Sequence, residues 1–218
     1  MTAAQPSARP GSARPGTVGR RERNKQDKLD RIMAAATALF AERGVSEVTT
    51  QEIADHADIG TGTLFLYAKT KGELLLMVQN SLYADALDRG RAGAAEEDEP
   101  VAALMALLRP IVECNRSHAE NGRVYLREMA FGDSFDQHRA TALRIAGETS
   151  DAVAATIVRT GLASPDESEA LAGLIGHEAR RAIEIGHTLA QDTGLSDRPA
   201  QALAEWEEHV RSSIEQNP

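Results

Sequence analysis

Cys114 and His118 are residues whose types and spacing could support nucleophilic chemistry. Residues four positions apart lie on the same face of a helix, so the imidazole could act as the base for the thiol. No glycine-rich loop that could form an oxyanion hole accompanies them, and no third residue is placed to orient the histidine. We therefore interpret Cys114 as a core residue and expect that the protein is not an enzyme.

A metal site is the second chemistry that the residue types allow. Glu184 and His187 form a Glu-x-x-His motif, and His177 and Glu178 precede it. A di-iron helix bundle needs two such motifs on separate helices, whereas this chain offers one. We expect no metal and no cofactor. A metal-responsive regulator or a metal-binding helical-bundle enzyme remains the alternative.

The charge distribution favours a third chemistry, which is binding to a polyanion. The net charge is −9, but residues 1–72 hold 11 Lys and Arg against 8 Asp and Glu, a balance of +3. Residues 73–218 hold 13 against 25, a balance of −12. This asymmetry indicates that the N-terminal part meets a nucleic acid and that the remainder does not. A chance imbalance of surface charge is the alternative.

The segment TTQEIADHADIGTGTLFLYAKTKGELL, residues 49–75, contains two short helices separated by a tight break. Thr49 and Glu52 form a capping box that starts the first helix. The second helix, about residues 61–67, is rich in poor helix formers and presents the apolar Leu66 where water is expected. This is helix-turn-helix geometry, in which the second helix enters the major groove of DNA.

The side chains of the second helix match the groups that duplex DNA presents. Thr61 and Thr63 can donate to phosphates or base edges, and Leu66 can contact thymine methyl groups. Gly62 lets the backbone approach the DNA closely. Core packing is the alternative for the aromatic residues. The candidate DNA-contacting residues are Arg23, Lys25, Lys28, Thr49, Thr50, Gln51, Thr61, Gly62, Thr63, Phe65, Leu66, Tyr67 and Lys71.

Residues 28–78 resemble the DNA-binding domain of the TetR family of transcriptional repressors. The family pattern reads roughly T-x-x-x-I-A-x-x-A-G-V-S-x-G-T-L-Y-x-Y-F-x-x-K-x-x-L. The matching residues are Thr49, Ile53, Ala54, Ala57, Ile59, Gly62, Thr63, Leu64, Tyr67, Lys71 and Leu74. The chain departs from the pattern at the turn glycine, the capping serine, the basic residue after it and two aromatics, where it has Asp58, Gly60, Thr61, Phe65 and Ala68.

The resemblance implies a homodimeric transcriptional repressor that a small molecule releases from a near-palindromic DNA operator. It also implies an effector pocket between about residues 101 and 161. The candidate ligand-binding residues, each with a core role as its alternative, are Met105, Leu108, His118, Tyr125, Met129, Phe131, Phe135 and His138. Two C-terminal helices, about residues 166–191 and 199–215, are expected to form the dimer interface through Leu171, Leu174, Ile175, Ile183, Leu203, Trp206 and Val210.

Apolar residues at helical spacing and the absence of any β-rich segment predict an all-α fold. We expect a helix from Lys25 that ends at Gly44, and a long helix that a capping box opens at Thr70. An acidic connector is expected over residues 90–100. Asp133 and Ser134 are expected to cap a helix that runs to Gly161.

We expect three parts: a disordered basic tail (residues 1–24), a three-helix helix-turn-helix DNA-binding domain (25–72) and an all-helical effector-binding and dimerisation domain (73–218). The tandem SARPG repeat in residues 7–16 cannot build a core. The arginines of the tail either track DNA phosphates or are merely solvated. The single cysteine, and the lack of an apolar run near the roughly 20 residues that cross a bilayer, predict a cytoplasmic protein with no membrane partner.

Overall fold

The computed structural model describes residues 19–116, 118–176, 208 and 212, and every regular element in this part of the chain is a helix. The all-α prediction is therefore confirmed. The helices are α1 (Arg20–Glu47), α2 (Thr50–His56), α3 (Thr61–Leu64), α4 (Lys71–Ala95), α5 (Pro100–Arg116), α6 (Ala119–Phe131) and α7 (Gln137–Arg159). A further helix begins at Pro165 and is described as far as Gly176.

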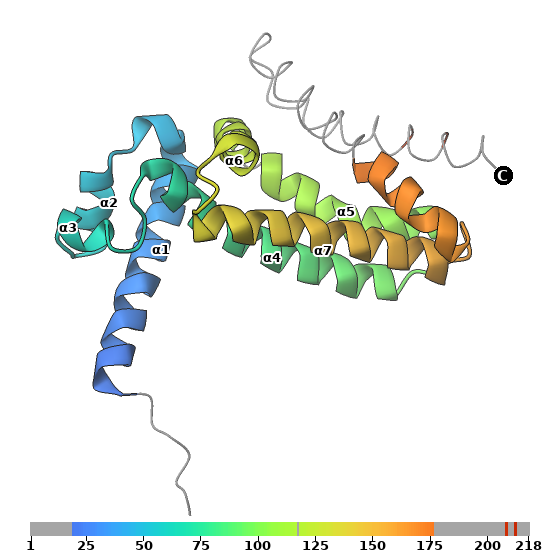
Figure 1. The fold of residues 1–218 in the computed structure, drawn as a ribbon, viewed down its shortest axis with the longest axis horizontal. Helices are drawn as coiled ribbons and strands as arrows, with labels where there is room; N and C mark the ends of the chain where they lie inside the picture. The colour runs from blue at the N-terminus through green and yellow to red at the C-terminus, as the bar shows by residue number, and fades with distance from the viewer. Residues whose placement is uncertain (1–18, 117, 177–207, 209–211, 213–218) are drawn as a thin grey trace, which may run out of the picture.

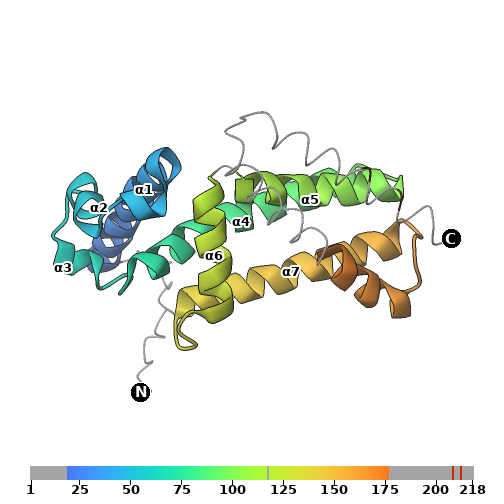
Figure 2. The same ribbon diagram turned by 90° about the horizontal axis from the view of Figure 1, so that it is seen from above.

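The helices α1, α2 and α3 gather at one end of the molecule, while α4, α5 and α7 run lengthwise through the rest (Figure 1). The view from above places α6 across the junction between these two parts (Figure 2). The first part of α1 projects away from the other helices (Figure 1). No helix in the described ranges is long and apolar enough to span a membrane.

The N-terminal helices enclose their own hydrophobic core. Phe40 of α1, Ile53 of α2, Leu64 of α3 and Leu75 of α4 are each no more than 1% exposed and belong to one cluster. Burying an aliphatic or aromatic side chain of this size contributes about 1.5–3 kcal/mol. The short helices α2 and α3 therefore depend on packing against α1 and α4, because helices this short are marginal alone.

The second part of the fold has two further clusters. One joins Leu87 of α4, Leu104 and Leu107 of α5 and Ile157 of α7, all at most 2% exposed. The other surrounds Tyr83 and Tyr125, whose rings stack with centroids 4.7 Å apart. The apolar spacing that predicted these helices thus corresponds to buried faces.

The expected helix starts are confirmed at two threonines. The Thr49 side chain accepts the Glu52 amide and the Glu52 carboxylate accepts the Thr49 amide, so the predicted capping box is complete. Thr70 caps α4 by accepting the Glu73 amide. The Glu73 carboxylate accepts the Lys69 amide at 2.6 Å, one residue earlier than a capping box requires.

Several predicted boundaries were wrong. The helix α1 starts at Arg20, before Lys25, so part of the expected tail is helical. The helix α4 continues to Ala95 through most of the expected connector. Gly90 lets α5 pack closely against this part of α4, because a Cβ there would lie 2.2 Å from the Leu107 carbonyl oxygen of α5. The cap of α7 is Asp136, whose carboxylate accepts two amides, in place of the expected residues 133–134.

Candidate nucleic-acid interface and ligand cavity

The turn that follows α3 presents two apolar side chains to solvent, while the helix itself is anchored by a buried leucine. Leu64 is buried at 1% exposure, whereas Phe65 is 44% and Leu66 83% exposed immediately after it. The sequence predicted a helix over about residues 61–67, but α3 ends at Leu64 and the following residues form turns. Phe65 and Leu66 thus form an exposed apolar tip at the end of α3, which water solvates poorly.

Contacts from α2 and α1 fix the position of α3. The Thr61 hydroxyl donates to the Gln51 side-chain oxygen at 2.6 Å, which ties the start of α3 to α2. In the turn between them Asp58 adopts a left-handed backbone with φ of 51°. Arg31 of α1 donates to the Asp58 carbonyl oxygen at 3.2 Å and to its carboxylate at 3.3 Å. The turn therefore keeps its geometry with an aspartate where the family pattern has glycine.

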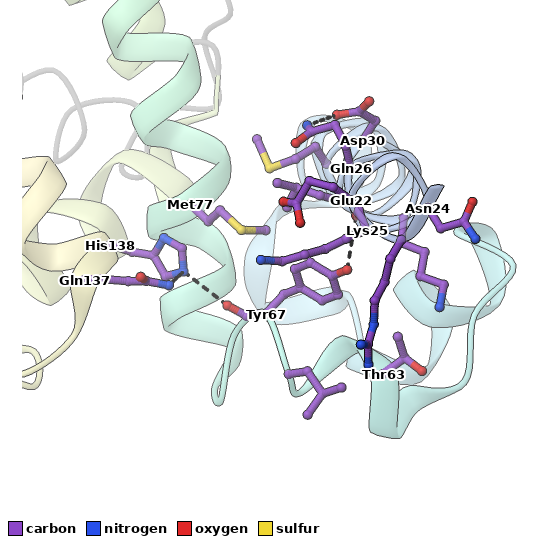
Figure 3. Close-up of a pocket in the computed structure, with 15 residues that line it drawn as sticks. Glu22, Asn24, Lys25, Gln26, Asp30, Thr63, Tyr67, Met77, Gln137 and His138 are labelled. Atoms are coloured by element: carbon purple, nitrogen blue, oxygen red, sulfur yellow. Dashed lines mark hydrogen bonds between the residues drawn. The ribbon is translucent and has the colours of Figure 1, made fainter. Parts of the chain in front are cut away.

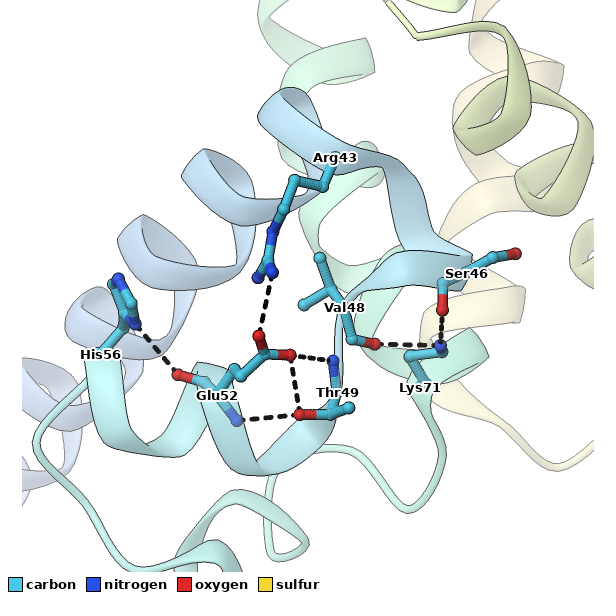
Figure 4. A network of polar contacts seen from close by, with 7 residues as sticks. All are labelled: Arg43, Ser46, Val48, Thr49, Glu52, His56 and Lys71. Carbon is cyan, nitrogen blue, oxygen red and sulfur yellow. Dashed lines mark hydrogen bonds and ion pairs between the residues drawn. The ribbon is translucent and has the colours of Figure 1, made fainter.

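A polar network sets the start of α2 (Figure 4). The Glu52 carboxylate accepts from the Thr49 amide at 2.7 Å and from the Arg43 guanidinium at 2.9 Å. The hydrogen bonds from Thr49, and then the one from Arg43, lower the pKa of Glu52 to about 2. The Lys71 ammonium donates to the carbonyl oxygens of Ser46 and Val48 at 3.1 and 3.0 Å, so in this structure it binds the end of α1.

A groove of about 1000 Å³ separates the projecting part of α1 from the end of α3 and the start of α7 (Figure 3). Lys25 and Lys28 line its α1 side, and Thr63 and Leu66 line the α3 side. The Tyr67 hydroxyl donates across the groove to the Lys25 carbonyl oxygen at 3.2 Å. Exposed cations, a hydroxyl and an apolar tip thus face one concave surface, which suits a phosphate backbone beside base edges.

A smaller cavity, of about 130 Å³, lies within the second part of the fold. Its described lining comes from α4, α5, α6, α7 and the helix that follows them, and it carries no charged side chain. The lining residues are Tyr83, Leu108, Ile111, Val112, Tyr125, Leu126, Met129, Ala142, Ile145, Ala146, Thr149, Ser150, Val153, Ala172 and Gly176. A mostly apolar cavity with a few hydroxyls is the usual form of a small-molecule site.

Residues 32–78 match the family model described as bacterial regulatory proteins, tetR family. The matched segment spans the end of α1, the two short helices and the start of α4, which are the elements that build the groove and the exposed tip.

Residues 32–78 carry the DNA-binding domain of the TetR family.

Solved structures share the fold over most of the chain. A putative transcriptional regulator from Rhodococcus sp. RHA1 has a TM-score of 0.63 at 19% identity, covering 88% of this chain and 96% of that one. The Thermus thermophilus FadR, a TetR-family repressor in complex with lauroyl-CoA, has a TM-score of 0.53 at 27% identity, with 85% and 92% covered. The Bacillus subtilis FadR in complex with stearoyl-CoA has a TM-score of 0.60 at 16% identity, with 83% and 96% covered. No curated protein matched.

Three of the residues predicted for the effector pocket line the cavity: Leu108, Tyr125 and Met129. Met105 is buried in the core cluster of α4, α5 and α7. Phe131 and Phe135 are 86% and 94% exposed, because the chain leaves α6 there and turns into the loop before α7.

The two histidines predicted for the pocket lie elsewhere. His118 packs against the backbone of Gly44 in α1, where an added Cβ would lie 2.4 Å from its ring. His138 lines the groove, with its Nε2 3.2 Å from the Tyr67 carbonyl oxygen. Both histidines therefore sit at contacts between the DNA-binding helices and the rest of the molecule.

Most of the cavity lining was missed from the sequence. Ala142, Ile145, Ala146, Thr149 and Val153 fall at positions i, i+3, i+4, i+7 and i+11 along α7. That spacing marks one face of a helix and could have identified them. The sequence reasoning favoured aromatic and histidine side chains, whereas small aliphatic and hydroxyl residues form this wall.

The thiol of Cys114 is half-buried, and burial raises its pKa to about 11. A nucleophilic cysteine needs a lowered pKa, so the local chemistry runs against catalysis. The residues of the metal alternative, Glu184 and His187 with His177 and Glu178, lie outside the described residues.

Of the residues predicted for the dimer interface, three are described. Leu171 is half-buried, Ile175 is buried and Leu174 is 56% exposed, all on the helix that begins at Pro165. The others, Ile183, Leu203, Trp206 and Val210, lie outside the described residues.

Proposed function

We propose that this TetR-family regulator is a homodimeric repressor that binds a near-palindromic operator and is released by a small molecule. The observation that carries the proposal is the apolar tip of α3, where Leu66 is 83% exposed beside the buried Leu64. Exposure of a leucine side chain to water is unfavourable, and burying it against a partner would stabilise the complex. The major groove offers thymine methyl groups as such a partner.

The DNA-binding domain is proposed to cover about residues 25–72. Thr63, Phe65 and Leu66 would read base edges, while Lys25 and Lys28 on the groove wall would contact phosphates. Arg23 and the α2 residues Thr49, Thr50 and Gln51 would add backbone contacts, with Tyr67 holding α1 against the end of α3. Lys71 would contribute by holding the end of α1 through its two carbonyl contacts.

The remainder of the chain is proposed to dimerise and to bind the effector. Two recognition helices must face successive major grooves, which a two-fold dimer provides. The exposed Leu174 supports a contact between copies near this helix. The uncharged cavity of about 130 Å³ supports an apolar effector or the apolar part of a larger one. Acyl-CoA ligands of the FadR neighbours are the natural first probes.

The test is fluorescence anisotropy of the full chain on labelled fragments flanking its own gene, across a salt series, with unrelated DNA of equal length as competitor. We expect tight binding to one fragment, two protomers per site, and an affinity that falls steeply with salt. Addition of lauroyl-CoA or stearoyl-CoA tests release. Equal and weak binding to every fragment would contradict the repressor assignment.

A matched pair of leucine variants tests the role of the α3 tip. Leu66→Ala should lower affinity for the selected fragment by roughly tenfold, comparable to the loss of one base contact. Leu143→Ala is the control, because Leu143 is also exposed but lies on α7. Equal affinities of the two variants would show that Leu66 does not touch DNA.

A further inference from the structure

A continuous chain of hydrogen bonds joins the wall of the cavity to the end of the recognition helix. The Tyr125 hydroxyl of α6 donates to the Asn80 side-chain oxygen at 3.0 Å. The Asn80 amide nitrogen of α4 donates to the His138 carbonyl oxygen at 2.8 Å. The His138 Nε2 lies 3.2 Å from the Tyr67 carbonyl oxygen, just beyond α3.

The middle of this chain is closed to water. Tyr125 is 4% and Asn80 6% exposed, so each loses a protein partner without gaining water if its neighbour moves. Leaving a buried polar group unpaired costs about 1–3 kcal/mol. These hydrogen bonds therefore fix the positions of α4, α6 and α7 relative to one another.

His138 is the link that reaches the DNA-binding part. A carbonyl oxygen can only accept, so Nε2 must carry the proton, and both the neutral Nε2–H tautomer and the imidazolium satisfy this. The same histidine lines the groove, across from Thr63 (Figure 3). Tyr67 in turn contacts α1, because its hydroxyl donates a hydrogen bond to the Lys25 carbonyl oxygen.

The cavity end is placed to receive a ligand. Tyr125 lines the cavity and stacks on Tyr83, which lines it too. A ligand that enters the cavity therefore contacts the Tyr125 ring. Movement of the Tyr125 ring would break its hydroxyl bond to Asn80.

We infer that Tyr125, Asn80 and His138 couple the cavity to the recognition helix, with His138 as a positioning residue for the segment from Thr63 to Ala68. A ligand that displaces Tyr125 loosens this segment and so weakens DNA binding. The ligand step rests on the proposed function, whereas the coupling itself is a property of the free protein.

Hydrogen–deuterium exchange of the full chain without DNA or ligand tests the coupling. Leu66, Tyr67 and Ala68 donate backbone hydrogen bonds to Thr63 and Leu64, so opening of this segment exposes them to exchange. Tyr125→Phe removes only the hydroxyl, and His138→Phe removes the imidazole donor. We expect each to speed exchange over residues 61–68 by about fivefold, the effect of losing one hydrogen bond.

The double variant separates a coupled chain from two local defects. If the chain acts as a unit, Tyr125→Phe combined with His138→Phe should exchange no faster than either single variant. His138→Gln keeps a donor and should lie closer to the wild type. Met129→Leu alters the cavity wall one helical turn from Tyr125 and should leave residues 61–68 unchanged.

Two results would overturn the coupling: unchanged exchange at residues 61–68 in Tyr125→Phe, or multiplied effects in the double variant. The anisotropy experiment distinguishes this from failure of the proposed function. A wild type that binds no DNA would refute the repressor, yet the exchange result would still decide whether the chain of hydrogen bonds holds α3.

Discussion

At the scale of single residues, the backbone at Gly44 kinks α1 shortly before its end at Glu47. Its φ of 80° lies in the left-handed region, and a Cβ would come within 2.4 Å of His118 and Glu120. Beyond it the chain turns so that the Val45 amide donates to Asn121 at 2.8 Å, while Asn121 donates to the Phe40 carbonyl oxygen at 2.7 Å. A buried asparagine of α6 thus satisfies the groups that the break in α1 leaves unpaired.

Gly44→Ala should destabilise the protein by about 2 kcal/mol or more, because it adds a left-handed backbone penalty to a steric clash. Gly62→Ala is the control, since nothing lies within 4 Å of an added Cβ there. The latter should be neutral to stabilising, because alanine favours the helix. Urea unfolding of both variants gives the free energies. A Gly44→Ala protein as stable as the wild type would refute the close packing of α6 on α1.

At the scale of elements, the start of α2 depends on an ionised carboxylate. Glu52 accepts from Thr49 and Arg43, which lower its pKa from 4.5 to about 2. A group with a depressed pKa in the folded state stabilises the fold above its unfolded pKa. That contribution is lost as the pH falls from about 4.5 toward 2.

Glu52→Gln should therefore be less stable than the wild type at about pH 7, and the difference should shrink steadily below about pH 4.5. Thermal unfolding at a series of pH values measures this. Glu42→Gln, at an exposed position of α1, controls for the loss of a surface carboxylate. A difference between Glu52→Gln and the wild type that persists unchanged at low pH would contradict the role of the carboxylate.

Sequence patterns predicted the existence of most elements but not all their ends. Thr49 with Glu52 placed the start of α2 because a capping box is local chemistry. The polar, acidic composition of residues 90–100 suggested a connector, yet α4 continues to Ala95. Gly90 packs there closely against the α5 backbone, a contact between distant residues that local composition does not reveal. Phe131 and Phe135 were predicted for the pocket because they are aromatic, but both are exposed. Residue type alone does not say which side of an element faces a neighbour.

At the scale of the whole molecule, the cavity and the recognition helix are distinct regions of one fold. The cavity lies among α4 to α7, and its described lining shares no residue with the groove at α3. The proposed repressor can therefore lose its response to a ligand without losing its affinity for DNA.

Ala146→Phe is expected to fill much of the cavity of about 130 Å³ from the α7 wall. With Tyr125 undisturbed, affinity for the selected DNA fragment should stay within a few-fold of the wild type. Release by lauroyl-CoA, where the wild type shows it, should be abolished. Anisotropy titrations with and without the acyl-CoA measure both quantities, and Ala140→Phe, at an exposed position of the same helix, is the control. A variant that responds as the wild type does would place the ligand elsewhere.

The helix α4 runs without interruption from Lys71 to Ala95, and its 25 residues extend for about 37 Å. Leu74, Leu75 and Val78 belong to the core of the DNA-binding helices, while Leu87 and Ala94 belong to the core around α5 and α7. Domains that can be exchanged are usually joined by a loop. Here the two parts share the helix α4, so any junction between them lies within that helix. Chimaeras that exchange the helices α1 to α3 should therefore be joined within α4 without a change in helical phase. A linker at residue 72 would remove Leu74, Leu75 and Val78 from the core of these helices.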